Sequence, residues 1–84
     1  TFSLNSIYPA VVSSVVNLQI SSERKEVASL EIMDINGRLL QRQTLALSDG
    51  IATYPVNVSS LATGSYLVRI TANEEILTGR FSKQ

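Results

Sequence analysis

The side chains that most often carry enzymatic chemistry are scarce in this chain, which contains no histidine and no cysteine. Without histidine it lacks the usual general base near neutral pH, and without either residue a zinc or copper site has no suitable ligands. The serines at 13–14 and 59–60 have no base partner in the sequence, so nucleophilic catalysis has no support. We therefore expect no catalytic residues, no metal and no cofactor, and we predict that the protein is not an enzyme.

The acidic residues are arranged as in turns rather than as in catalytic or calcium sites. Asp34 and Asp49 stand alone near glycines, where an aspartate ordinarily accepts hydrogen bonds from backbone N–H groups. A Ca²⁺ loop would need several oxygen ligands at short spacing, and none is present. Glu74 and Glu75 are adjacent, so on a strand they would point to opposite faces, unlike the paired carboxylates of a glycosidase.

The charges of the chain are balanced, with seven basic and seven acidic residues. No basic stripe is present, and the run Glu23–Glu26 is mixed in sign, so we expect no nucleic-acid partner. No apolar run approaches the roughly 20 residues that a membrane-spanning helix needs. The chain opens on Thr1 without a signal-peptide pattern. We therefore expect residues 1–84 to be one domain excised from a longer protein.

Apolar residues recur at every second position in many short segments, which predicts strands. In the segments over 15–21 and 28–34 the residues in phase are Val16, Leu18, Ile20, Ala28, Leu30 and Ile32. Further segments of this kind bring the total to about seven, spaced by roughly 10–12 residues. We predict an all-β fold, an Ig-like antiparallel β-sandwich of about seven short strands.

The pair Asn36-Gly37 lies between two strand-like segments and is a strong signal for a β-hairpin. Because Asn and Gly adopt positive φ angles at little cost, the pair predicts a type I′ turn. Residues 28–35 and 38–45 should then pair antiparallel, with Asn36 and Gly37 in a structural role.

Gly64 stands directly ahead of the strand-like run that contains Tyr66. A glycine at this point lets the connection turn sharply, so that 65–71 can pair with 76–82. Tyr66 is in phase with the apolar residues of its strand and should lie in the core with its hydroxyl at the rim. Gly79, within the last strand, predicts a β-bulge or a close backbone approach.

The order of these motifs resembles the C-terminal sorting domain of the type IX (Por) secretion system of Bacteroidota. The resemblance covers essentially the whole chain, and Ala10-Val11 depart from it where the family usually has Asn-Pro. The pieces that match are Tyr8-Pro9, the strand Val16–Ile20, "LEIMDINGRLL" over 30–40, "LATGSYLVRI" over 61–70 and "GRFSKQ" over 79–84.

This resemblance implies that the chain is a C-terminal sorting signal attached to another protein, its parent. The parent would cross the periplasm, pass a translocon in the outer membrane, and reach the cell surface or the medium. In many members a sortase-like surface protease removes the domain and joins the cargo to an anionic lipopolysaccharide, whereas in others the domain stays attached. Both outcomes remain open for this chain, as does the identity of its parent.

A sorting label should expose strand edges or a terminal segment that a receptor can bind. The last strand is terminal and basic, and we expect Arg80, Phe81 and Lys83 to form the recognition tail. Deleting Arg80–Gln84 should then end export and leave the sandwich folded. Exposed sheet edges also favour a homodimer.

The alternative interpretation is a structural or adhesive Ig-like accessory module of a surface protein. A sugar-binding module would present aromatic side chains together on one exposed sheet face. Tyr54 and Tyr66 are instead in phase with core residues, which argues against this interpretation. Finding Tyr8, Tyr54 and Tyr66 coplanar on the surface would favour it.

Overall fold

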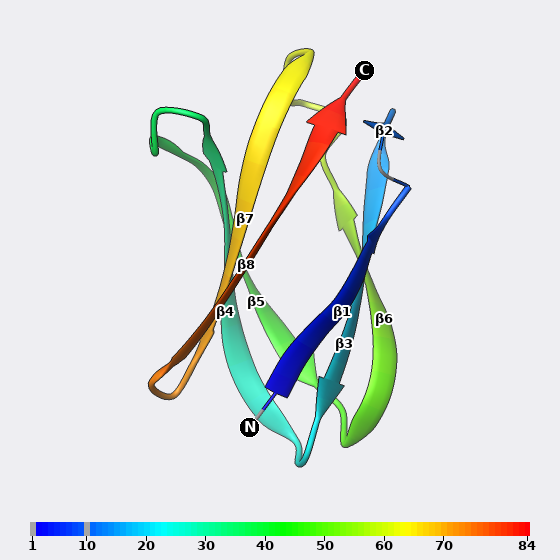
Figure 1. The fold of residues 1–84 in the computed structure, drawn as a ribbon, viewed down its shortest axis with the longest axis vertical. Helices are drawn as coiled ribbons and strands as arrows, with labels where there is room; N and C mark the ends of the chain where they lie inside the picture. Colours follow the sequence, from blue (N-terminus) through cyan, green and yellow to red (C-terminus); the bar gives the residue numbers. More distant parts are fainter. Residues whose placement is uncertain (1, 10) are drawn as a thin grey trace.

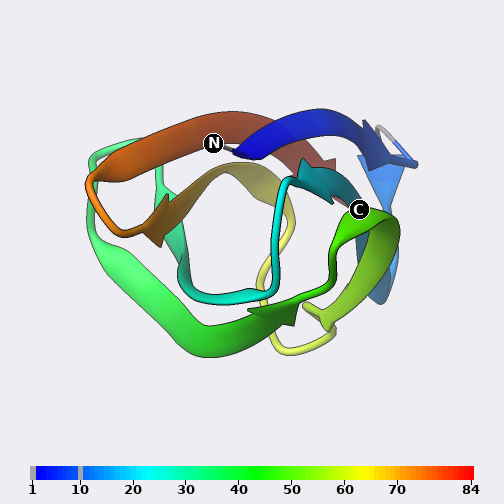
Figure 2. The ribbon, with the colours of Figure 1, turned by 90° about the horizontal axis from the view of Figure 1, so that it is seen from below.

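The computed structural model describes residues 2–9 and 11–84, which form a β-sandwich of two sheets (Figures 1 and 2). None of the described residues is helical, and therefore no helix among them is long and apolar enough to cross a membrane. In chain order the strands of the described part are β1 (Phe2–Tyr8), β2 (Val11–Val12), β3 (Val15–Ser22), β4 (Glu26–Asp34), β5 (Leu39–Leu47), β6 (Gly50–Asn57), β7 (Gly64–Ala72) and β8 (Glu75–Lys83). The predicted all-β sandwich is confirmed. The strand beyond the expected seven or so is β2, whose two residues are too few to show a period.

The chain changes sheet repeatedly as it builds the sandwich. One sheet has the strand order β1-β3-β6 and the other has the order β2-β8-β7-β4-β5. The pairings are antiparallel except for the short parallel contact of β2 with β8. The turn at 48–49 therefore links the two sheets instead of closing a hairpin within one of them.

The two ends of the sandwich carry different connections (Figure 1). One end, here called the N-end, holds the connections 23–25, 48–49 and 73–74 and the beginning of β1. The other, here called the C-end, holds the connections 35–38 and 58–63 and the last residue. The beginning of β1 and the end of β8 thus lie at opposite ends of the long axis.

The alternation that predicted the strands also decides which side chains enter the core. The in-phase residues of β3 and β4 are at most 1% exposed, and their neighbours in the strands face outward. Each fully buried aliphatic side chain contributes about 1.5–3 kcal/mol to folding. The largest fully buried side chains are Leu18, Ile20, Leu30, Ile32, Ile70, Val12, Val16, Val56, Val58 and Val68.

The β4–β5 hairpin pairs as predicted, but its turn is not the expected type I′ turn. Gly37 has φ +85°, whereas Asn36 lacks the positive φ that a type I′ turn requires. Gly37 N–H donates to the Asp34 carbonyl and Asp34 N–H donates to the Arg38 carbonyl, both at 3.0 Å. This is the pattern of a type I turn followed by a glycine bulge.

The side chain of Asp34 accounts for the difference. Its Oδ1 accepts hydrogen bonds from the N–H groups of Asn36 at 2.9 Å and of Arg38 at 3.0 Å. An aspartate that bonds to the backbone two and four residues later stabilises this longer loop. The expected role of Asp34 as a backbone cap is confirmed, and that cap selects the turn.

Gly79 is a point of close approach between the two sheets. Strand β8 pairs with β7 without a register shift, so the alternative of a β-bulge at Gly79 was wrong. A Cβ at this position would collide with Ile7 Cδ1 and lie 3.1 Å from Leu4 Cδ2. Strand β1 therefore packs against β8 at a place where β8 has no side chain.

Candidate functional site

Asp34 and Glu31 are two acidic side chains that are engaged in structural contacts. Asp34 caps the β4–β5 turn, and Glu31 accepts hydrogen bonds from Arg69 at 2.6 and 2.8 Å. Arg42 also lies near Glu31, with Nε 3.9 Å from Oε2. Over residues 2–9 and 11–84, no three His, Cys, Asp or Glu side chains come together in a way that could hold a metal ion.

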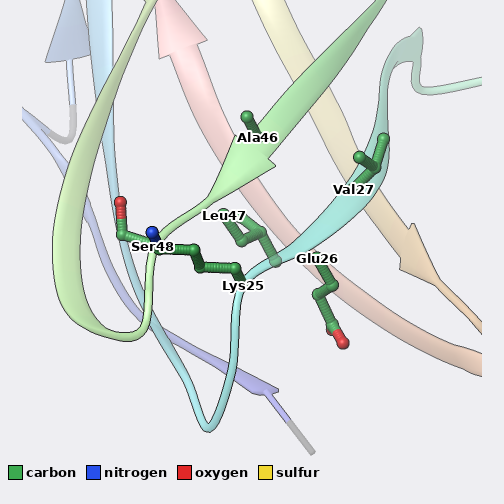
Figure 3. Close-up of a pocket in the computed structure, with 6 residues that line it drawn as sticks. All are labelled: Lys25, Glu26, Val27, Ala46, Leu47 and Ser48. Carbon is green, nitrogen blue, oxygen red and sulfur yellow. The ribbon is translucent and has the colours of Figure 1, made fainter.

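A shallow depression of about 360 Å³ lies at the N-end, between the start of β4 and the end of β5 (Figure 3). In Figure 3 the carboxylate of Glu26 points away from Ala46 and Leu47. The lining is mainly aliphatic and offers a ligand little beyond apolar contact. It consists of Lys25, Glu26, Val27, Ala46, Leu47 and Ser48.

The three residues of the predicted recognition tail do not share one environment. Arg80 is exposed on the outer face of the five-stranded sheet, whereas Phe81 is 3% exposed and belongs to the core. Lys83 is also buried, at 9% exposure, and its Nζ lies 3.3 Å from the Gln84 carbonyl oxygen. Because side chains alternate along a strand, Arg80 is the one of the three that a partner can contact directly.

Tyr66 and Gly64 hold the start of β7 against the end of β8. The ring of Tyr66 stacks on Phe81, with centroids 5.6 Å apart and planes inclined by 27°. Its hydroxyl donates to the Ala62 carbonyl, as expected for a core tyrosine with a hydroxyl at the rim. Gly64 has φ +157°, which side chains rarely allow, and it pairs with Lys83. The predicted pairing of 65–71 with 76–82 is confirmed.

A second depression, of about 270 Å³, opens beside Arg80 at the C-end. Ile35, which was not singled out as a candidate site residue from the sequence, contributes to this depression from the hairpin tip and is 71% exposed. From the sequence, residue 35 was assigned to the strand-like segment 28–35, whereas β4 ends at Asp34 and Ile35 lies in the turn. The lining consists of Ile35, Ser65, Tyr66, Leu67, Arg80, Phe81 and Ser82.

Arg80 differs from the other arginines in its surroundings. Each of the others has a carboxylate oxygen within 4.0 Å, in the pairs Arg24–Glu26, Arg38–Asp34, Arg42–Glu31 and Arg69–Glu31. Arg80 makes neither an ion pair nor a hydrogen bond with any residue that the structure describes. Its guanidinium is therefore available to an external acceptor.

The tyrosines do not form an exposed platform. Tyr66 is buried and Tyr54 is half-buried, with its hydroxyl accepting a hydrogen bond from Ser48 N–H at 2.8 Å. Tyr8 alone of the three is an exposed large side chain. The coplanar arrangement that would favour a sugar-binding accessory module is not found.

Comparison with solved structures shows that the fold recurs in proteins of several kinds. CopC from Methylosinus trichosporium OB3b is 21% identical with a TM-score of 0.64, covering 99% of this chain and 91% of that one. The β-glucosidase EmGH1 from Erythrobacter marinus is 10% identical with a TM-score of 0.64, covering 100% of this chain and 15% of the enzyme. A β-glucosidase from Listeria innocua is 17% identical with a TM-score of 0.59, covering 99% of this chain and 16% of the enzyme. At these identities the similarity shows the fold alone.

Comparison with protein families identifies a family, whereas the solved structures show only the fold. No curated protein matches the chain, but the family described as secretion system C-terminal sorting domain matches residues 6–84. The matched range includes the hairpin motif, the Gly64–Tyr66 motif and Tyr8-Pro9, which are joined by a cis peptide bond. Ala10, where the sequence departs from the family, lies outside the described residues. The chain belongs to the family of type IX (Por) secretion system C-terminal sorting domains.

Proposed function

We propose that residues 1–84 are a non-catalytic sorting domain that sends its parent protein through the type IX secretion machinery to the cell surface or the medium. The observation that carries this proposal is the family match over residues 6–84, which spans both sheets of the sandwich. The domain architecture is suited to this role. Its apolar residues form one core cluster, so the chain can fold without contacts from a cargo.

In this proposal the outer-membrane translocon recognises the folded domain after the parent has crossed the periplasm. Because β1 begins at the N-end, a cargo joined ahead of β1 would lie at that end, away from Arg80 and the C-end that the translocon would contact. A sortase-like surface protease then acts at the junction between cargo and domain. In parents that are joined to an anionic lipopolysaccharide, the modified part is the cargo and not this sandwich.

The sheet edges provide a second mode of association, a homodimer. Strands β5 and β6 are edge strands, and an exposed edge accepts an added strand through main-chain hydrogen bonds. Pro55 lies in β6 and lacks an N–H donor, so of these two strands β5 is the more suitable edge. Sedimentation velocity at rising protein concentration tests this part of the proposal, and a monomer throughout would contradict it.

The test of the main proposal is a fusion of residues 1–84 behind a reporter that carries an ordinary signal peptide. The fusion should reach the surface or medium of a Bacteroidota strain with a working type IX system and stay in the periplasm of a translocon-deficient strain. The same reporter carrying Leu30→Asp, which places a charge in the core, controls for folding. Retention of the unmodified fusion in the periplasm of the working strain would contradict the proposal.

A further inference from the structure

The charged residues are unevenly divided between the ends of the molecule. Five acidic and two basic residues lie at the N-end, in its connections and the first residues of the adjoining strands. The remaining part of the chain holds five basic and two acidic residues. The N-end group is Glu23, Arg24, Lys25, Glu26, Asp49, Glu74 and Glu75. A neutral chain thus presents a cationic surface toward its C-end.

On this cationic part, the strand register aligns one apolar row with Arg80. Leu39 pairs with Met33, Met33 pairs with Leu67, and Leu67 pairs with Arg80, so the four residues lie across β5, β4, β7 and β8. We call them the Arg80 row. Leu39 is 46% exposed, Met33 and Leu67 are partly exposed, and none of the three belongs to the core cluster.

In the adjacent row toward the N-end, the charged side chains pair with one another. Arg42 pairs with Glu31 and Glu31 pairs with Arg69 across the same strands, and both arginines contact the Glu31 carboxylate. That row therefore has no free carboxylate with which to pair Arg80. The Arg80 row is the place on this face where an apolar surface ends in an unpaired guanidinium.

We propose that the Arg80 row and the depression beside it bind a short acidic, amphipathic peptide segment of the protein that recognises this domain. A guanidinium is suited to bind a carboxylate through two parallel hydrogen bonds. Apolar side chains of the same segment would cover Leu39, Met33 and Leu67, with one of them in the depression lined by Ile35. Three strand spacings of about 4.8 Å make the row about 14 Å long, or about four extended residues.

Two other occupants fit the surface less well. An anionic membrane surface is ordinarily bound by clusters of about four to eight basic side chains, whereas the row ends in one. A second copy of the chain could offer Ile76 beside Glu74 and Glu75, but these lie at the N-end, next to the cargo of the parent protein. An acidic segment of a receptor that approaches the C-end meets neither difficulty. The inference rests on the proposed function for its choice of partner.

The binding test uses ¹⁵N-labelled residues 1–84 and the synthetic peptide acetyl-Leu-Asp-Leu-Glu-Leu-amide. Amide shifts should concentrate at Leu39, Met33, Leu67 and Arg80, and the Asn/Gln version of the peptide should bind more weakly. Arg80→Gln should weaken binding about tenfold, the scale of one charge-assisted pair. Arg42→Gln, an exposed arginine on the same face, should change affinity less than about twofold. Shifts confined to other strands, or equal binding of both peptides, would overturn the inference.

The same samples test the competing occupants. Without peptide, concentration-dependent shifts at both Arg80 and 74–76 would mean that a second copy fills the site, and would overturn the inference. Arg80-dependent binding to phosphatidylglycerol vesicles in place of the peptide would overturn it as well. In cells, the reporter fusion with Arg80→Glu should be retained and the one with Arg42→Glu exported. Equal export of the two variants would contradict the inference and leave the proposed function intact. Failure of the unmodified fusion would contradict the proposed function and, with it, the choice of a receptor segment as the partner.

Discussion

Gly79 illustrates how the absence of one side chain allows two sheets to meet. It pairs with Val68 in the interior of β8, where glycine is ordinarily less favourable than alanine by about 0.5–1 kcal/mol. The space that a Cβ would occupy is filled by Ile7 and Leu4 of β1. The glycine is therefore kept by packing between sheets, and its role is visible only when β1 is in place.

We expect Gly79→Ala to destabilise the domain by about 1 kcal/mol, because overpacking outweighs the gain in backbone entropy. Ile7→Val removes the Cδ1 atom that the new methyl group would strike, so the double variant should lose less stability than the sum of the single variants. Urea denaturation of the four proteins measures this coupling. Additivity within about 0.3 kcal/mol would show that Ile7 is not the neighbour that excludes a side chain.

Among the structural elements, β8 supplies both core packing and the exposed Arg80 that we propose binds a partner. Its alternation sends Phe81 and Lys83 inward and Arg80 outward, and it pairs with β7 along its whole length. Gln84 N–H also donates to the Val12 carbonyl at 2.8 Å, just beyond the short β2–β8 contact. The tail that was expected from the sequence to be separable from the sandwich thus pairs with β7 and contributes Phe81 to the core.

Deleting residues 80–84 should therefore unfold the domain, contrary to the expectation from the sequence alone. Loss of the buried Phe81 costs about 3–5 kcal/mol, which is comparable to the whole stability of many small domains. Arg80→Gln should change stability by less than about 0.5 kcal/mol, because Arg80 is exposed. Thermal denaturation followed by circular dichroism compares the two variants with the parent chain. A truncated chain with an unchanged midpoint would contradict the role given to Phe81.

For the molecule as a whole, the central fact is that neighbouring strands are often distant in sequence. Strands β3 and β6 pair in one sheet, β4 and β7 pair in the other, and β1 packs against β8 across the sandwich. Such contacts require large loops to close before they stabilise the chain. The same arrangement separates the acidic N-end from the cationic surface toward the C-end.

We expect folding to be a slow, single-exponential process on the millisecond-to-second scale, as in other sandwiches dominated by non-local pairings. Stopped-flow dilution from urea, followed by the fluorescence of the three tyrosines, measures the rate. Asp34→Ala, which removes a local turn cap, serves as a comparison that alters one hairpin and no distant pairing. Complete folding in microseconds would mean that the distant pairings do not limit the rate.

Most of the strands and the composition of the core could be predicted from the sequence. Alternation of apolar and polar residues is a property of each strand, and it does not depend on the order in which the strands of a sandwich are arranged. Val16, Leu18 and Ile20, and then Ala28, Leu30 and Ile32, were assigned to the core on that basis, and all are buried. The Asn36-Gly37 hairpin and the family were also identified. The turn type was not, because it depends on a side-chain contact from Asp34.

The candidate site could be predicted only in part. The last strand and Arg80 were identified from their position and charge, but the burial of Phe81 and Lys83 follows from the face that β8 turns toward the core. The row of Leu39, Met33, Leu67 and Arg80 had no local signal, since its members come from four strands and meet only through register. By itself the sequence determined the strands, their inward faces and the family. The tertiary structure decided which side chains become neighbours, because strand order and register depend on contacts between segments far apart in the chain.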